Sequence, residues 1–123
     1  MDIRNIDESE SFITKDGSEI RELLAHRNSC IAKQSLAEAR VPAGAVTEAH
    51  FHPETEEIYY ILEGSGVMSI GADSQDVRPG DAIAIPPGAT HWIENTGEST
   101  LRFLCCCAPG YEHTDTVLVN PSS

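Results

Sequence analysis

Residues 44–64 read GAVTEAHFHPETEEIYYILEG, a stretch that sets His50, His52 and Glu57 inside an apolar, aromatic-bearing segment. Successive side chains of a strand point to opposite faces, so His50 and His52 are predicted to face the same way. Imidazole nitrogens and carboxylate oxygens are ligands that divalent metals accept, and a turn at Pro53 would bring Glu57 back beside the histidines. An isolated His-x-His pair is more often solvated at a sheet edge, so a metal site requires further ligands elsewhere in the chain.

After residue 45 the sequence is a series of short runs rich in β-branched and aromatic residues. The runs are TEAHFH, EIYYIL, GVMSI, DAIAI, HWIEN, TLRFLCCC and DTVLV, and the turn signals between them include EGSG, GADSQD and RPGD. Many short strands without intervening helices predict an all-β sandwich or barrel. We extend this prediction to residues 19–41, where the hydrophobic period alone also allows a helix. The glycines at 64 and 66 predict a hairpin that pairs the Glu57 strand with Val67–Ile70.

The chain of 123 residues is predicted to form one domain over residues 19–119, with residues 1–18 and 120–123 as polar tails. Its 20 acidic and 8 basic residues give a formal net charge of −12, which disfavours nucleic acid and membrane surfaces as partners. With no apolar run of about 18 residues and no signal peptide, we expect a cytoplasmic protein. Cys30 and the cysteines at 105–107 are predicted to be reduced, buried thiols.

A further histidine lies in residues 80–95, GDAIAIPPGATHWIEN, where a rigid Pro-Pro-Gly turn leads into His91. With this segment in place, the chain resembles the cupin superfamily. The first cupin motif is a glycine, five residues, His-x-His, three or four residues, a glutamate, six residues and a glycine, and it is filled by Gly44, His50, His52, Glu57 and Gly64. The second motif is a glycine, five residues, Pro-x-Gly, two residues, a histidine, three residues and an asparagine, and it is filled by Gly80, Pro86, Gly88, His91 and Asn95.

The resemblance implies a cupin-type double-stranded β-helix, or jelly-roll barrel, that holds one divalent transition metal ion. The ligands that it carries over are His50, His52, Glu57 and His91. Glu56 is a local competitor of Glu57, but the six-residue step to Gly64 favours Glu57. Four ligands on a six-coordinate ion leave two adjacent positions for water, dioxygen or a bidentate substrate. Such a donor set suits iron, manganese, nickel, cobalt, copper or zinc.

Other side chains are weaker candidates for the pocket. Glu48 shares the parity of the histidine pair and could act as an acid or base, although a solvated carboxylate is the more common outcome. Tyr59 is expected to face inward, and His113 lies in a loop before the last strand. His26 is given no role. Further candidates for the pocket lining are Arg40, Phe103 and Cys105. Trp92 is considered with them, but it is adjacent to His91 and is therefore expected to point to the opposite face, toward the core or a subunit contact.

These features predict a metal-dependent enzyme of the oxygenase or isomerase type that acts on a small oxygen-rich organic molecule. A non-catalytic module that binds or senses a small molecule is the alternative, because one fold hosts many functions. A metal-free structural domain is the third reading. Edge strands of small β domains are often covered by a second subunit, so we expect a homodimer, with residues 19–41 contributing.

Overall fold

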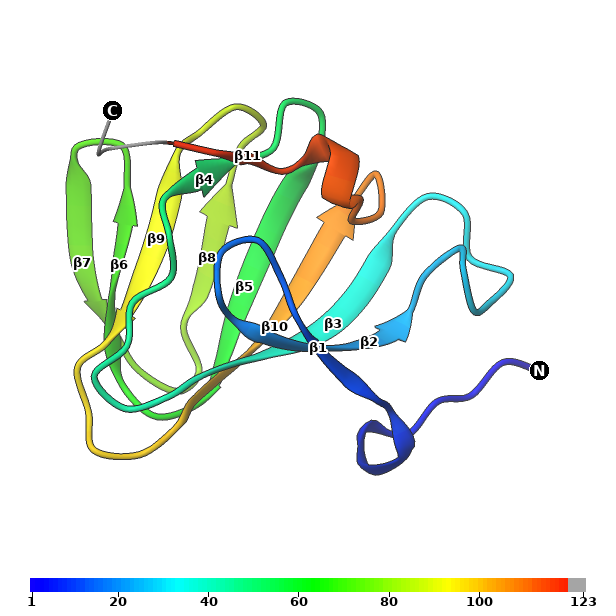
Figure 1. Cartoon of the computed structure of the whole chain (residues 1–123), viewed down its shortest axis with the longest axis horizontal. Helices are drawn as coiled ribbons and strands as arrows, with labels where there is room; N and C mark the ends of the chain where they lie inside the picture. The colour runs from blue at the N-terminus through cyan, green and yellow to red at the C-terminus, as the bar shows by residue number, and fades with distance from the viewer. Residues whose placement is uncertain (120–123) are drawn as a thin grey trace.

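The computed structural model describes residues 1–119 and consists almost entirely of antiparallel strands (Figure 1). The elements, in chain order, are η1 (Ile6–Glu8), β1 (Ser11–Ile13), β2 (Glu19–Leu24), β3 (Ser35–Val41), β4 (His50–Phe51), β5 (Glu56–Glu63), β6 (Gly66–Ile70), β7 (Asp73–Val77), β8 (Ala82–Ile85), β9 (His91–Asn95), β10 (Leu101–Ala108), η2 (His113–Asp115) and β11 (Val117–Leu118). Neither helical turn of this described part is long and apolar enough to cross a membrane.

The strands form two sheets that enclose the interior. One sheet has the order β1-β2-β3-β10-β5-β8, and the other has the order β11-β4-β9-β6-β7. Neighbours such as β3 and β10 are far apart in the sequence, so each sheet combines strands from both halves of the chain. This arrangement confirms the predicted all-β jelly-roll barrel.

The core lies between the two sheets and follows the alternation of the strands. On β5, Tyr59 and Ile61 are buried, whereas Ile58 and Tyr60 are exposed, as the strand period predicts. β10 alternates in the same way along its whole length. The buried hydrophobic cluster consists of Ala39, Val41, Tyr59, Ile61, Met68, Val77, Ile85, Ile93, Leu101, Phe103 and Cys105.

The link between β5 and β6 crosses from one sheet to the other, so the predicted hairpin is wrong. β5 pairs with β10 and β8, whereas β6 pairs with β7 and β9. Gly64 has a φ of +87°, and a Cβ on Gly66 would lie 2.3 Å from the carbonyl oxygen of Glu94 on β9. The two glycines therefore let the chain turn a corner and pack closely against β9.

Two polar segments expected to lack strands contain them. GADSQD was expected to be a turn, but Asp73–Val77 forms β7 at the edge of the five-stranded sheet. Its first four residues are exposed. The segment therefore lacks the alternation of apolar and polar residues that would mark a half-buried strand in the sequence. In the predicted N-terminal tail, β1 pairs with β2. The division of the chain at residues 18 and 120 stays a prediction, and residues 120–123 lie outside the described residues.

The four cysteines are free thiols, as predicted. Cys105 and Cys107 are buried on the inward face of β10, and Cys106 is half-buried. Cys30 is exposed in the loop between β2 and β3, so the prediction of burial is wrong for this residue.

Candidate metal centre

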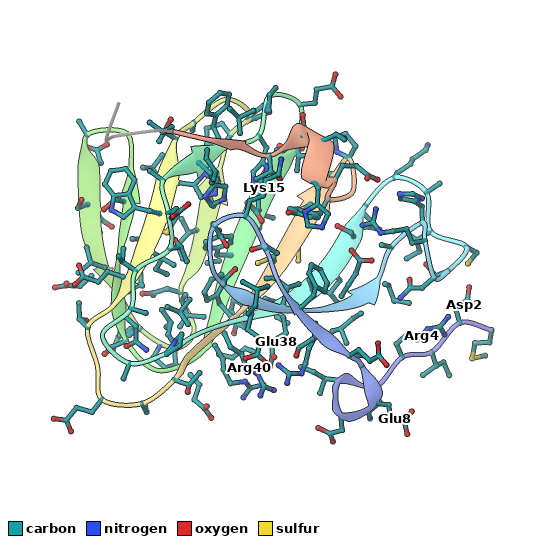
Figure 2. All side chains as sticks on the ribbon, in the orientation of Figure 1. Asp2, Arg4, Glu8, Lys15, Glu38 and Arg40 are labelled. Atoms are coloured by element: carbon teal, nitrogen blue, oxygen red, sulfur yellow. The ribbon has the colours of Figure 1, made fainter. Side chains whose placement is uncertain are left out.

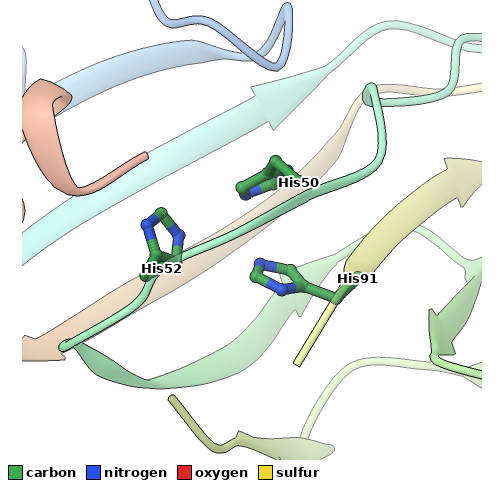
Figure 3. A group of neighbouring side chains, drawn as sticks. All are labelled: His50, His52 and His91. Carbon is green, nitrogen blue, oxygen red and sulfur yellow. The ribbon is translucent and has the colours of Figure 1, made fainter. Parts of the chain in front are cut away.

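Three imidazole rings converge inside the barrel (Figure 3). His50 on β4 is the direct cross-strand partner of His91 on β9, and His52 follows just after β4. All three residues are buried, and each offers a nitrogen atom that lies within 4.8 Å of the nitrogens of the others. Strand pairing therefore unites residues that are some forty positions apart in the sequence.

Each ring is oriented by a hydrogen bond at Nδ1. The Nδ1 atoms of His50, His91 and His52 lie 2.8, 3.0 and 3.1 Å from the backbone carbonyl oxygens of Glu48, Ala89 and Asp115, respectively. Because a carbonyl oxygen can only accept, each Nδ1 carries the hydrogen, and the Nε2 lone pair of the neutral ring is free. This is how proteins orient histidine ligands before a metal binds.

Glu57 reaches the histidines from β5 in the opposite sheet. Its Oε1 lies 3.4 Å from Nε2 of His52 and 3.5 Å from Nε2 of His91. The Cys107 thiol donates to Oε2 at 3.3 Å, which fixes the other end of the carboxylate. Glu57 is buried and the neighbouring Glu56 is exposed, so Glu57 is the glutamate that meets the three rings.

Two buried polar atoms in residues 1–119 are left without a hydrogen-bond partner at this point, Glu57 Oε1 and His91 Nε2. An unsatisfied buried donor or acceptor costs about 1–3 kcal/mol. Both atoms can act as Lewis bases, and both face the same small region. A divalent cation fits this set of nitrogen and oxygen donors, because it would satisfy both atoms at once.

The local electrostatics set the charge states of Glu57 and His50. Burial would raise the pKa of Glu57, but the adjacent rings of His52 and His91 outweigh it and lower the pKa to about 2. Burial, followed by the charge of His91, lowers the pKa of His50. Burial also opposes protonation of His52, but Glu57 outweighs it and raises the net pKa of that ring. Glu57 is thus a carboxylate and His50 a neutral base near pH 7.

A cavity of about 40 Å³ lies beside the histidines. One water needs about 10–15 Å³ on this scale, so the cavity holds about three waters. Tyr59, Phe103 and Cys105 line it, as predicted for the pocket. The rings of Tyr59 and Phe103 are 4.5 Å apart and form one wall, and burial raises the pKa of the Tyr59 hydroxyl, which keeps it neutral.

Two pocket candidates, Glu48 and Arg40, do not line this cavity, and neither does Trp92, which was expected to face away. Glu48 is exposed, because β4 begins only at His50 and strand parity does not extend back to it. Arg40 lies on the outer face of β3, where it binds Glu38. Trp92 follows a ligand candidate on β9 and faces away from the cavity, as alternation requires.

His113 and His26 lie outside the cavity lining. His113 is exposed in η2, and its Nδ1 lies 3.1 Å from the hydroxyl of Tyr111, which does line the cavity. Any catalytic role of His113 stays a prediction. His26 is exposed and pairs with Glu112 at 2.5 Å.

Asp16, which was not predicted as a site residue, lines the cavity. It lies in the turn between β1 and β2, is 8% exposed, and places Oδ2 3.7 Å from Nε2 of His50. Asp16-Gly17 between two short apolar runs is a hairpin signal that could have located the turn. The burial of that turn depends on tertiary packing. Lining residues that were also missed are Thr14, Ser18, Ile20, Glu22, Tyr111 and Thr116.

Comparison with known proteins gives matches over the same region. The family described as "Cupin domain" matches residues 37–107, which include all four converging side chains. An uncharacterized protein of Methanocaldococcus jannaschii is 50% identical over 113 residues, which are 92% of this chain and 90% of that protein. The oxalate-binding protein of Thermotoga maritima is 38% identical over 69 residues, which are 56% of this chain and 57% of that protein.

Two solved structures resemble the whole barrel. The polyketide cyclase RemF from Streptomyces resistomycificus superimposes with a TM-score of 0.83 at 26% identity, covering 100% of this chain and 88% of that chain. A predicted oxalate decarboxylase from Thermotoga maritima superimposes with a TM-score of 0.76 at 28% identity, covering 87% of this chain and 98% of that chain.

Proposed function

We propose, from the premise that this chain belongs to the cupin family, that it is a metal-dependent enzyme acting on a small oxygen-bearing organic molecule. His50, His52, His91 and Glu57 would hold one divalent transition metal ion. The observation that carries this proposal is the pair of unpartnered buried atoms, Glu57 Oε1 and His91 Nε2, which face two further imidazoles. A purely structural cluster would be expected to pair these atoms within the chain.

When bound, an ion of this kind supplies Lewis-acid polarisation of a substrate oxygen, and iron, manganese or copper can also supply redox chemistry. The chain's own residues orient and enclose it. Glu57 provides a negative charge whose direction is fixed by the Cys107 thiol. Tyr59 and Phe103 provide an apolar wall that limits water. These features support either an oxygenase or an isomerase.

The relatives differ in the molecules that their names mention. One is an oxalate-binding protein and another is a polyketide cyclase. The chain spans little more than half of the oxalate-binding protein, so oxalate is not carried over directly. We take the broader class, a small molecule with oxygen donors, as the proposed substrate, because nitrogen and oxygen ligands suit an ion that accepts oxygen donors.

A second copy of the chain is the proposed partner. Ile58 and Tyr60 are 48% and 41% exposed on the outer face of β5. Their register partners on β10 are Cys106 and Leu104, so the four side chains form one apolar patch. Exposed apolar patches of this kind favour self-association through a two-fold interface.

Light scattering tests the dimer. We expect twice the chain mass of 13.3 kDa for the unmodified protein, and a monomer for Tyr60→Glu, which places a charge in the patch. A 13.3 kDa species of the unmodified protein at micromolar concentration would contradict the dimer.

Turnover assays test the enzymatic proposal. Metal-loaded protein is incubated with a panel of oxygen-bearing acids, sugars and hydroxyketones, with and without dioxygen. We expect turnover that is lost after chelation and in His91→Ala. Ligand binding without turnover across the panel would favour the alternative, a non-catalytic binding or sensing module. Full metal content in His91→Ala would overturn the ligand assignment.

A further inference from the structure

The charges that line the cavity are unbalanced. The lining contains three carboxylates, Asp16, Glu22 and Glu57, and no lysine or arginine among the described residues. Glu22 is neutralised by Arg27, whose Nη2 lies 2.7 Å from its carboxylate. Glu57 faces the proposed ion. Asp16 therefore remains as a buried carboxylate with no lysine or arginine in contact among residues 1–119.

Asp16 is held by its own turn. Its Oδ1 accepts hydrogen bonds from the Thr14 hydroxyl at 2.5 Å, the Ser18 hydroxyl at 2.7 Å and the Ser18 N–H at 2.9 Å. These donors occupy Oδ1 and leave Oδ2 directed toward His50, at 3.7 Å from Nε2. An ionised carboxylate has acceptor sites on both oxygens, so Oδ2 can accept from a ligand.

The turn is tied to the segments around the metal centre. The backbone N–H of Glu48 donates to the Asp16 carbonyl at 2.8 Å, and Glu48 also orients one of the site histidines. Lys15 Nζ donates to the carbonyls of His113 and Thr116 at 2.8 and 3.0 Å. Figure 2 labels Lys15. In Figure 1 the turn lies in front of β5 and β10. The Asp16 carboxylate is thus positioned before any ligand enters.

We propose that Asp16 makes this site select neutral ligands that donate a hydrogen bond, such as hydroxyl-bearing carbonyl compounds, over small dianions such as oxalate. The inference rests on the proposed metal centre. A divalent ion with the carboxylates of Glu57 and Asp16 is neutral overall, so a dianion would be buried beside Asp16 without a compensating charge. A ligand hydroxyl would instead donate a charge-assisted hydrogen bond to Oδ2. The wall of Tyr59 and Phe103 also suits a neutral ligand.

The test compares two probes on the Mn²⁺-loaded protein, oxalate and the neutral hydroxyketone hydroxyacetone. Water-proton relaxation reports each ligand as it displaces water from the bound ion. In Asp16→Asn we expect oxalate to bind at least about tenfold tighter, because a repelling negative charge is lost. Hydroxyacetone should bind about threefold weaker, because its hydroxyl loses a charged acceptor. The asparagine carbonyl can still accept from Thr14 and Ser18, so the turn should persist, and circular dichroism checks this.

Two controls separate the charge of Asp16 from other effects. Glu48→Gln removes the same charge from an exposed side chain near His50 and should change either affinity by less than about twofold. Thr14→Val removes one donor to Asp16 but keeps its charge, so oxalate should remain as weak as in the unmodified protein.

Three results would overturn the proposal. An unchanged ratio of the two affinities in Asp16→Asn would remove the selective role. A loss of about 100-fold in Mn²⁺ affinity in Asp16→Asn, a size expected for a metal-site group, would assign Asp16 to the ion instead. An unmodified chain that fails to bind Mn²⁺ would overturn the metal centre itself, and this appears in the first titration, before any ligand is added.

Discussion

Glu38 and Glu57 are both buried glutamates on the six-stranded sheet, at 0% and 5% exposure, but their surroundings differ. Glu38 on β3 faces outward and is bound by Arg40 at 2.6 Å and Arg102 at 2.5 Å. Figure 2 shows Glu38 beside Arg40 and apart from Lys15. Glu57 on β5 faces inward and keeps one oxygen without a partner.

The comparison separates a structural buried charge from a functional one. Burial would raise the pKa of Glu38, but hydrogen bonds from Arg40 and Arg102 outweigh it and lower the pKa. The pKa of Glu57 is lowered in the same direction by histidines. The chain therefore completes the environment of Glu38 itself, whereas that of Glu57 would be completed by the proposed cation.

The largest expected effect comes from Glu57→Gln. We expect Mn²⁺ affinity to fall more than about 100-fold, because loss of groups that merely support ligands already costs about 10–100-fold. Without metal, Glu57→Gln should lose less free energy of unfolding than Glu38→Gln, because Oε1 of Glu57 has no hydrogen-bond partner and only His52 and His91 offset the burial of its charge. Titration calorimetry and urea unfolding measure both. Glu56→Gln, a change at the exposed neighbouring residue, is the control. Equal Mn²⁺ affinities in Glu56→Gln and Glu57→Gln would contradict the role of Glu57 in metal binding.

Metal loading should stabilise the folded chain by about 2.7 kcal/mol at a free Mn²⁺ concentration 100 times Kd, because only the folded site binds. Chelation should reverse the gain, and Glu57→Gln should gain less than about 0.4 kcal/mol, because the same Mn²⁺ concentration no longer exceeds its Kd. Unfolding in urea with buffered Mn²⁺ measures this stabilisation. His113 lies outside the cavity lining, so the control variant His113→Ala should be stabilised by Mn²⁺ as much as the unmodified chain. The same gain in Glu57→Gln would place the bound metal elsewhere.

Glu38→Gln should show the opposite pattern to Glu57→Gln. We expect the free energy of unfolding to fall by about 2 kcal/mol, because charged hydrogen bonds to Arg40 and Arg102 are lost. Mn²⁺ affinity should stay unchanged, since this side chain faces away from the cavity. A loss of metal binding without a loss of stability would contradict the structural role of Glu38.

A smaller effect should appear in the pH dependence of the unfolding free energy that Glu38→Gln loses relative to the unmodified chain. The folded pKa of Glu38 is lowered below its ordinary value of 4.5, so its charge stabilises the fold fully above that value. The stability lost in Glu38→Gln should therefore be constant from pH 7 to 5 and shrink as the pH falls through the lower folded pKa. Urea unfolding at a series of pH values measures this, and a difference that grows in acid would show that the sign is wrong.

The converging residues of the metal centre could be predicted because they stand in two short motifs that the chain shares with cupins. Alternation places His50 and His52 on one side, and the turn before His91 needs a glycine, since Gly88 has a φ of +79°. The Gly88 N–H also donates to the carbonyl of His52 at 2.8 Å, which joins the two motifs. These local rules predict the histidine pair and the turn before His91, whereas the convergence of Glu57 and His91 on that pair was implied by the resemblance to the cupin superfamily.

Features that depend on tertiary packing could not be predicted in the same way. The Asp16 turn has the composition of an exposed hairpin, and its burial arises because Lys15 and Glu48 bind it to distant segments. The corner at Gly66 resembles a hairpin locally, but its close approach to Glu94 directs β6 into the other sheet. β7 is polar because its edge position exposes it.

The most direct test of the metal centre is anomalous diffraction from crystals of the protein loaded with Zn²⁺ or Mn²⁺. The account predicts one strong peak per chain, within about 2.3 Å of Nε2 of His50, His52 and His91 and of a Glu57 oxygen. Peaks confined to surface carboxylates, with the three imidazoles free of metal, would contradict it.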